Sequence, residues 1–143
     1  QLNLAVSDCG SSMSGHITKL SPTSVPLGST TTVVGSGSIS KGFSAGTITA
    51  TVKALGVVLK TCSGDACGKT TCELPGGGGT LTMGGFSCTQ AIGDVALDFG
   101  VQVAASLPSA LQVLELDFAV KDASGGDFLC SQINTSPALN LLV

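Results

Sequence analysis

The sequence alternates most strictly in the stretch Val95-Ala96-Leu97-Asp98-Phe99-Gly100-Val101-Gln102-Val103. Every odd position carries a large apolar side chain, whereas the even positions carry Ala, Asp, Gly and Gln. Successive side chains of a strand point to opposite faces of a sheet, so this pattern predicts a strand with one buried face. The same alternation in Thr47–Lys53 and Leu114–Lys121 predicts two further strands.

Less regular strands are expected in five other stretches, which are Leu2–Val6, His16–Ser21, Thr30–Ile39, Leu55–Thr61 and Phe128–Ile133. Turn signals such as Ser124-Gly125-Gly126-Asp127 separate the strands, and no segment shows a capped helical stripe. We therefore predict one all-β domain over residues 1–143, an immunoglobulin-like antiparallel β-sandwich of about eight strands. The Gly-rich segment from Cys62 to Cys88 is expected to bury little apolar surface and to depend on crosslinks.

Composition excludes two broad classes. The 143 residues are 43% hydrophobic and 10% charged, which excludes disorder of the highly charged kind. The net charge is −3 and the chain has no Arg, Trp or Tyr, so it lacks the basic face and stacking aromatics of a nucleic-acid-binding protein. No apolar stretch reaches the length needed to cross a bilayer.

The six cysteines point to an oxidising compartment. An even number of cysteines in a small chain is typical of disulfides, and a start at Gln1 rather than Met suggests a processed product. The triplet Asn134-Thr135-Ser136 makes Asn134 a candidate glycosylation site. We expect a secreted or lumenal protein, with the lysosome and the vacuole included.

A metal site is the alternative interpretation of the cysteines. Cys62, Cys67 and Cys72 are spaced regularly, but zinc needs a fourth ligand and the only histidine, His16, lies far away in sequence. We therefore favour disulfides and expect no bound metal.

Spacing does not choose among the 15 possible disulfide pairings. A Cys9–Cys130 bond would close nearly the whole chain, a loop worth roughly 4–5 kcal/mol of stability. The other four cysteines have a most local solution, Cys62–Cys67 with Cys72–Cys88.

Catalytic chemistry finds little support. His16 stands alone at strand spacing and is interpreted as an exposed structural histidine. Glu115 and Asp117 share one face of a strand. They could form the carboxylate pair of a hydrolase, or they could belong to a solvated outer face that includes Lys121. We favour the solvated face. No G-x-S-x-G motif is present. We expect no enzyme activity and no cofactor.

Several short motifs carry a family resemblance: Ser7-Asp8-Cys9-Gly10, Ile17–Pro22, Pro26–Gly35, Thr61-Cys62 with Cys67 and Cys72, Leu107-Pro108-Ser109, and Phe128-Leu129-Cys130. In their order and spacing the chain resembles the ML (lipid-recognition) family, closest to its ganglioside-activator branch. The resemblance implies two splayed sheets that hold a lipid between them. It also implies the pairings Cys9–Cys130, Cys62–Cys67 and Cys72–Cys88. Ala110 stands where the ganglioside activator has a membrane-contacting aromatic residue.

The inward faces of the strands are almost purely apolar, which suits a solid core as well as a lipid cavity. With the resemblance, we predict an elongated cavity of roughly 300 Å³ or more, opening between Leu55–Leu59 and Leu107–Leu111. The expected lipid-binding residues are Ile48, Val52, Leu55, Val58, Leu97, Phe99, Val101, Leu107, Leu111, Leu114, Leu116 and Phe118.

The sequence thus predicts a non-enzymatic carrier that holds an acyl lipid, sterol or glycolipid and contacts membranes transiently, as a monomer or weak dimer. Two alternatives stay open. One is an activator that presents a glycolipid to a hydrolase, which an assay with and without the protein would reveal. The other is a secreted interaction module with a solid core.

Overall fold

The alternating stretches form strands in the computed structural model, which describes residues 1–137. Strand β5 covers Gly46–Ala54, β9 covers Gly93–Val103 and β10 covers Glu115–Asp122. Their apolar side chains point inward as the alternation predicts, and Phe99 and Phe118 are 6% and 2% exposed. The predicted all-β class is therefore confirmed.

Eight further strands complete the part of the chain that the structure describes. They are β1 (Leu2–Asp8), β2 (Gly15–Ser21), β3 (Ser24–Val25), β4 (Thr30–Ile39), β6 (Val57–Asp65), β7 (Thr70–Leu74), β8 (Gly79–Met83) and β11 (Asp127–Pro137). Two short 3₁₀ segments, η1 (Pro75–Gly77) and η2 (Ser109–Leu111), lie in loops. Among these residues, no helical segment combines the length and the hydropathy that a membrane span requires.

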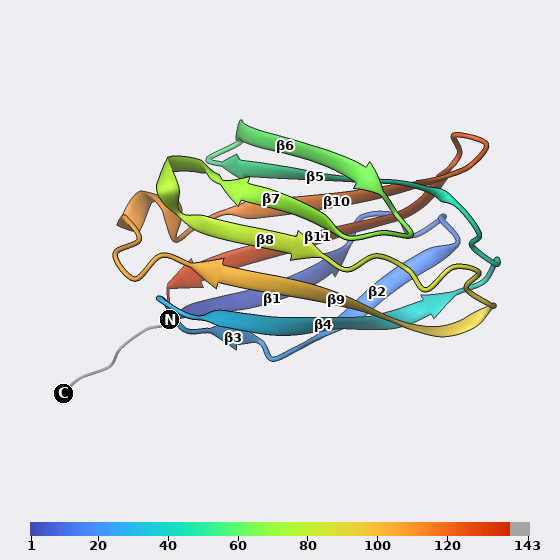
Figure 1. The fold of residues 1–143 in the computed structure, drawn as a ribbon, viewed down its shortest axis with the longest axis horizontal. Helices are drawn as coiled ribbons and strands as arrows, with labels where there is room; N and C mark the ends of the chain where they lie inside the picture. The colour runs from blue at the N-terminus through green and yellow to red at the C-terminus, as the bar shows by residue number, and fades with distance from the viewer. Residues whose placement is uncertain (138–143) are drawn as a thin grey trace.

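The strands form one hydrogen-bonded sheet rather than the two separate sheets that the sequence predicts. The strand order is β6-β5-β10-β11-β2-β4-β9-β8-β7, and β1 adds to β11 and to β3. The contact between β11 and β2 is a single parallel bridge, Leu129 to Gly15, so the sheet turns sharply there. The result is a nearly closed, barrel-like shape in which β7, β8 and β9 lie in front of β10, β11 and β1 (Figure 1).

A disulfide closes this shape where hydrogen bonds do not. β6 and β7 stand at the two ends of the strand order, and each pairs with only one neighbour. Cys62 of β6 and Cys72 of β7 are bonded to each other. The crosslink therefore joins the two ends of the sheet.

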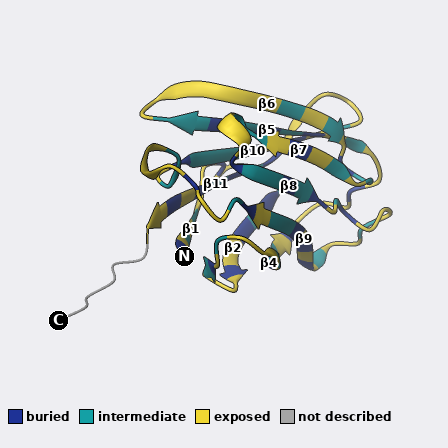
Figure 2. Cartoon of the chain, turned by 60° about the vertical axis from the view of Figure 1, so that its left-hand side comes forward, coloured by how far each residue is buried: buried dark blue, intermediate teal, exposed yellow. Residues whose placement is uncertain are grey.

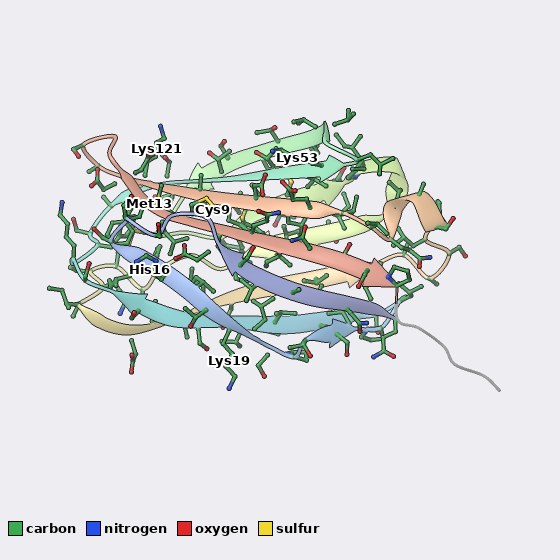
Figure 3. All side chains as sticks on the ribbon, turned by 180° about the vertical axis from the view of Figure 1, so that it is seen from behind. Cys9, Met13, His16, Lys19, Lys53 and Lys121 are labelled. Carbon is green, nitrogen blue, oxygen red and sulfur yellow. A yellow bond between two sulfur atoms is a disulfide. The ribbon has the colours of Figure 1, made fainter. Side chains whose placement is uncertain are left out.

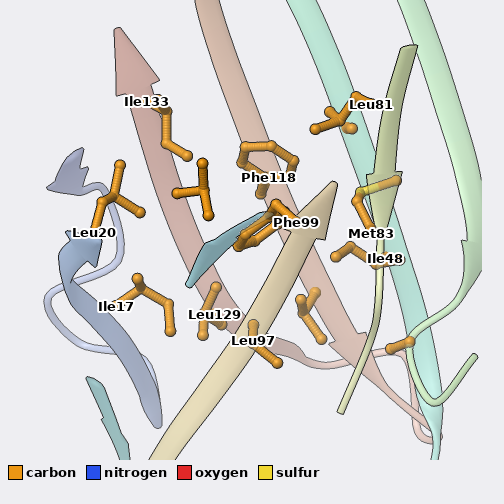
Figure 4. Close-up of a cluster of buried hydrophobic side chains, with 14 of the residues drawn as sticks. Ile17, Leu20, Ile48, Leu81, Met83, Leu97, Phe99, Phe118, Leu129 and Ile133 are labelled. Carbon is orange, nitrogen blue, oxygen red and sulfur yellow. The ribbon is translucent and has the colours of Figure 1, made fainter. Parts of the chain in front are cut away.

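The five phenylalanines fill the interior in two groups. The ring centroid of Phe43 lies 4.7 Å from that of Phe86 and 4.8 Å from that of Phe128. Phe99 and Phe118 form a second pair at 5.2 Å, from facing strands (Figure 4). Aromatic pairs at such distances add to the stability that comes from burial alone.

The Gly-rich segment is more ordered than its composition predicts, and our expectation of little burial there is wrong. β7 and β8 form a hairpin whose turn uses Gly76 and Gly77 at φ +67° and +70°, a region that glycine enters without steric cost. Thr80-Leu81-Thr82-Met83 alternates, and this places Leu81 and Met83 in the core. This hairpin and the short β3 raise the count from about eight strands to eleven in residues 1–137.

The disulfide pattern is partly as predicted. Cys9–Cys130 is confirmed, but the local pairs Cys62–Cys67 and Cys72–Cys88 are wrong, because the bonds are Cys62–Cys72 and Cys67–Cys88. Tertiary contacts explain the difference. The backbone N–H of Phe86 donates to the carbonyl of Ala66 at 2.7 Å, which brings the Cys88 segment beside Cys67. All six cysteines are bonded, which indicates an oxidising extracellular or lumenal compartment.

Peptide mapping distinguishes the two patterns. Cleavage before Asp residues and after Lys and Glu residues leaves each cysteine of this region on its own fragment. Under non-reducing conditions we expect residues 61–64 linked to 70–73, and residues 65–69 linked to 74–93. Recovery of 61–64 linked to 65–69 would instead support the local pairing. The same digest after reduction is the control, since every linked mass should then disappear.

Candidate functional site

An apolar pocket lies between the layers at the end of the fold where β1 and β10 begin and β9 and β11 finish. Its side chains are almost all hydrocarbon, and its volume is about 50 Å³. The lining residues are Leu2, Leu4, Val25, Val33, Leu74, Pro75, Gly78, Leu81, Phe99, Val101, Val103, Leu107, Leu111, Leu114, Leu116, Phe118, Ile133 and Thr135.

The predicted lipid-binding residues divide into three groups. Phe99, Val101, Leu107, Leu111, Leu114, Leu116 and Phe118 line this pocket. Ile48 and Leu97 line a smaller inner space of about 10 Å³. Val52 is fully buried outside both spaces, whereas Leu55 and Val58 are 97% and 54% exposed.

The pocket is much smaller than the cavity of roughly 300 Å³ that we expect for a lipid carrier. The facing rings of Phe99 and Phe118 contact each other in the middle of the interior and occupy the space between the layers. The small number of large residues therefore does not leave a wide void, because two of the five Phe rings meet at the centre.

The mouth is built from the predicted Leu107–Leu111 segment and from an unpredicted one, Leu74–Gly78, which contains η1. The predicted contribution of Leu55–Leu59 to the wall is wrong, since the β5–β6 hairpin lies outside the lining.

Thr135 holds the η2 side of the mouth in place. Its buried hydroxyl accepts a hydrogen bond from the Leu114 N–H at 2.9 Å and donates to the Gln112 carbonyl at 3.0 Å. The side chain of Gln112 donates in turn to the Leu107 carbonyl at 3.0 Å. Because these bonds tie the segment to β11, the mouth has one firmly held edge.

The tip of the β5–β6 hairpin forms an exposed apolar patch beside this end of the fold. Lys53 of β5 pairs with Glu115 at the start of β10, which places the tip next to the Val113–Leu114 segment. The patch consists of Leu55, Val57, Val58, Leu59 and Val113, which are 39–97% exposed. The first five residues of β6 are all exposed, and the strand lies at the surface (Figure 2).

The inner space holds a polar group that sequence reasoning did not single out. Ser131 of β11 is 4% exposed, and its hydroxyl has no hydrogen-bond partner among the described residues. The side chains around it come from Ile17, Leu20, Ile48, Leu97, Phe99, Phe118, Val120, Leu129 and Ile133. A buried hydroxyl without a partner costs about 1–3 kcal/mol.

Charged groups lie on the outer face. Lys53 is one of them (Figure 3). Its ammonium is 2.9 Å from a carboxylate oxygen of Asp117 and 3.7 Å from one of Glu115. The hydrogen bond to Asp117 raises the pKa of Lys53, and the hydrogen bond between the two carboxyl groups raises the pKa of Glu115. The cation here is thus Lys53, whereas Lys121 lies 3.9 Å from Asp127. This geometry agrees with a solvated face.

His16 is partly exposed, as predicted, and has a partner. Its Nδ1 lies 2.7 Å from a carboxylate oxygen of Asp8. The backbone N–H of Gly10 donates to the same carboxyl group at 3.0 Å and lowers the pKa of Asp8, with a smaller contribution from His16. The pair joins the end of β1 to β2 beside the single-bridge turn of the sheet. Asn134 is exposed on β11, so its side chain is accessible.

Sequence reasoning missed the part of the pocket wall that comes from the first strand and the Gly-rich hairpin. Leu2 and Leu4 alternate within a stretch that was predicted as a strand, and Leu81 alternates within Thr80–Met83. This alternation was the available signal.

Within residues 1–137 no three metal-ligating side chains come together. No protein-family model matches the chain, and no curated protein is detectably similar to it.

Proposed function

We propose that this chain is a non-enzymatic lipid-binding protein of the ML type, which takes one apolar chain into the pocket between its layers. The observation that carries the proposal is the lining of that pocket, in which hydrocarbon side chains from both layers converge on a mouth at one end. Transfer of an acyl chain from water to such a lining is favourable by about 25 cal/mol per Å² of apolar surface.

The small volume sets a condition on this function. The rings of Phe99 and Phe118 close the centre of the interior, so a ligand must displace them to extend beyond the pocket. Separation of the layers at the seam between β6 and β7 would break no ladder of hydrogen bonds, and the Cys62–Cys72 disulfide limits its extent.

The exposed tip of the β5–β6 hairpin supports contact with a membrane. Leu55 has φ +51°, a left-handed conformation that costs a branched residue roughly 1–2 kcal/mol. Asn followed by Gly56 would suit this turn better. A strained, 97% exposed leucine beside the mouth is explained if it inserts into lipid during ligand exchange.

Leu55→Asn tests this role. We expect the unfolding free energy to rise by about 1 kcal/mol, because Asn tolerates the left-handed turn. We expect binding to phosphatidylcholine vesicles to fall about tenfold, since a Leu side chain contributes about 1.5–3 kcal/mol on burial. Vesicle flotation measures the binding, and chemical denaturation measures the unfolding free energy.

Ile92→Asn is the matched control. Ile92 is 68% exposed just before β9, at the opposite end of the fold from the pocket. It should leave vesicle binding unchanged. Equal losses for the two variants would contradict a specific role for the hairpin tip.

A solid-core interaction module is the second candidate, and the pocket volume of about 50 Å³ favours it. Native mass spectrometry of the protein with hexadecanoate separates the two. A carrier gives a one-to-one complex that survives transfer to the gas phase. Failure to form that complex, with no change in thermal stability upon adding hexadecanoate, would favour the interaction module.

A further inference from the structure

The inner space and the pocket are two parts of one interior. Phe99, Phe118 and Ile133 line both of them. The pocket lies on the mouth side of the facing rings, and the inner space lies beyond, around Leu129 and Ser131. A chain that enters at the mouth and displaces the rings therefore arrives at Ser131.

Ser131 is the single polar side chain among those that line the inner space in the described residues. Its hydroxyl is buried and unpartnered. The other buried hydroxyl of the interior, on Thr135, makes two hydrogen bonds. Buried polar groups are normally satisfied, so an isolated exception calls for a partner from outside the chain.

Water is a poor partner at this position. The inner space of about 10 Å³ is the size of one water molecule. A buried water typically makes about three hydrogen bonds, and here the surrounding side chains other than Ser131 are hydrocarbon. A water here would thus bind the Ser131 hydroxyl but would itself lack its other hydrogen-bond partners.

We propose that the bound lipid carries a hydrogen-bonding oxygen near the inner end of its chain, and that Ser131 binds this oxygen. The ligand class is a long-chain lipid with a hydroxyl or keto group distant from its solvent-facing head. The inference rests on the proposed function, because it needs a chain in the pocket. Ser131 then selects oxygenated chains over plain hydrocarbon chains of equal length.

The test uses ligands that differ only at the inner end. Hexadecanoate is compared with its 12-, 14- and 16-hydroxy derivatives, which all keep the same carboxylate at the mouth. Calorimetric affinities are measured for the native chain and for Ser131→Ala. Ser7→Ala, an exposed serine on β1, is the control for the loss of a hydroxyl.

We expect one of the three hydroxy derivatives to bind the native chain more tightly than hexadecanoate does. The ratio of these two affinities should be about tenfold larger for the native chain than for Ser131→Ala. Ser7→Ala should keep the native ratio. Ser131→Ala should also be no less stable than the native chain without ligand, because it removes an unpartnered buried hydroxyl.

The same measurements distinguish a failure of the proposed function from a failure of the role of Ser131. If hexadecanoate and its derivatives all fail to bind the native chain, the proposed function falls and this inference falls with it. If they bind, but no hydroxylated position shows a preference that depends on Ser131, the carrier function stands and the role of Ser131 is refuted.

Discussion

Replacement of Cys9 and Cys130 by Ala together is expected to lower the unfolding free energy by about 4–5 kcal/mol. The bond joins residues 121 positions apart, so its loss releases nearly the whole chain in the unfolded state. In the folded state it links the loop after β1 to β11. Chemical denaturation of the double variant under non-reducing conditions measures the change.

The pair Cys62→Ala with Cys72→Ala is the matched comparison. Its bond closes a separation of 10 residues, for which the chain-entropy relation gives only about 3 kcal/mol. A larger loss for this pair than for Cys9 with Cys130 would show that closing the sheet between β6 and β7 matters more than loop entropy.

Phe118→Ala is expected to lower the unfolding free energy by about 3–5 kcal/mol and to raise the affinity for hexadecanoate. The side chain is 2% exposed and contributes one of the two rings that close the interior. Its removal therefore leaves a void that adjoins the pocket. A ligand that fills this void recovers part of the lost burial, and ligand at 100 times its Kd adds about 2.7 kcal/mol of stability.

Phe43→Ala provides the control for Phe118→Ala. Phe43 is 1% exposed and packs against Phe86 and Phe128, away from both the pocket and the inner space. We expect a similar loss of stability with no gain in affinity. If Phe118→Ala gains no affinity either, the interior is a solid core and the interaction module is the better proposal.

Alternation in the sequence is enough to predict the strand class and the faces of the regular strands. In Gly93–Val103 and Glu115–Asp122 the period of two assigns each side chain to one face, because a slip by one residue would bury Asp98 and Asp117. Phe99 and Phe118 therefore face inward as predicted. Alternation is a local property, so it can be interpreted without knowledge of the partner strands.

Which distant segments meet depends on the arrangement of the strands in three dimensions. The pairing of Cys62 with Cys72 depends on β6 and β7 standing at the two ends of one sheet, and no spacing rule contains that information. The replacement of Leu55–Leu59 by Leu74–Gly78 at the mouth has the same cause.

The pocket volume and the unpartnered hydroxyl of Ser131 also escaped the sequence. Both depend on how side chains from facing strands fill shared space, and Phe99 and Phe118 are 19 positions apart in the chain but in contact in the core. Packing of this kind is a sum over contacts between residues that are remote in sequence. Period and composition fix which side chains point inward, and the fold alone fixes what they meet there.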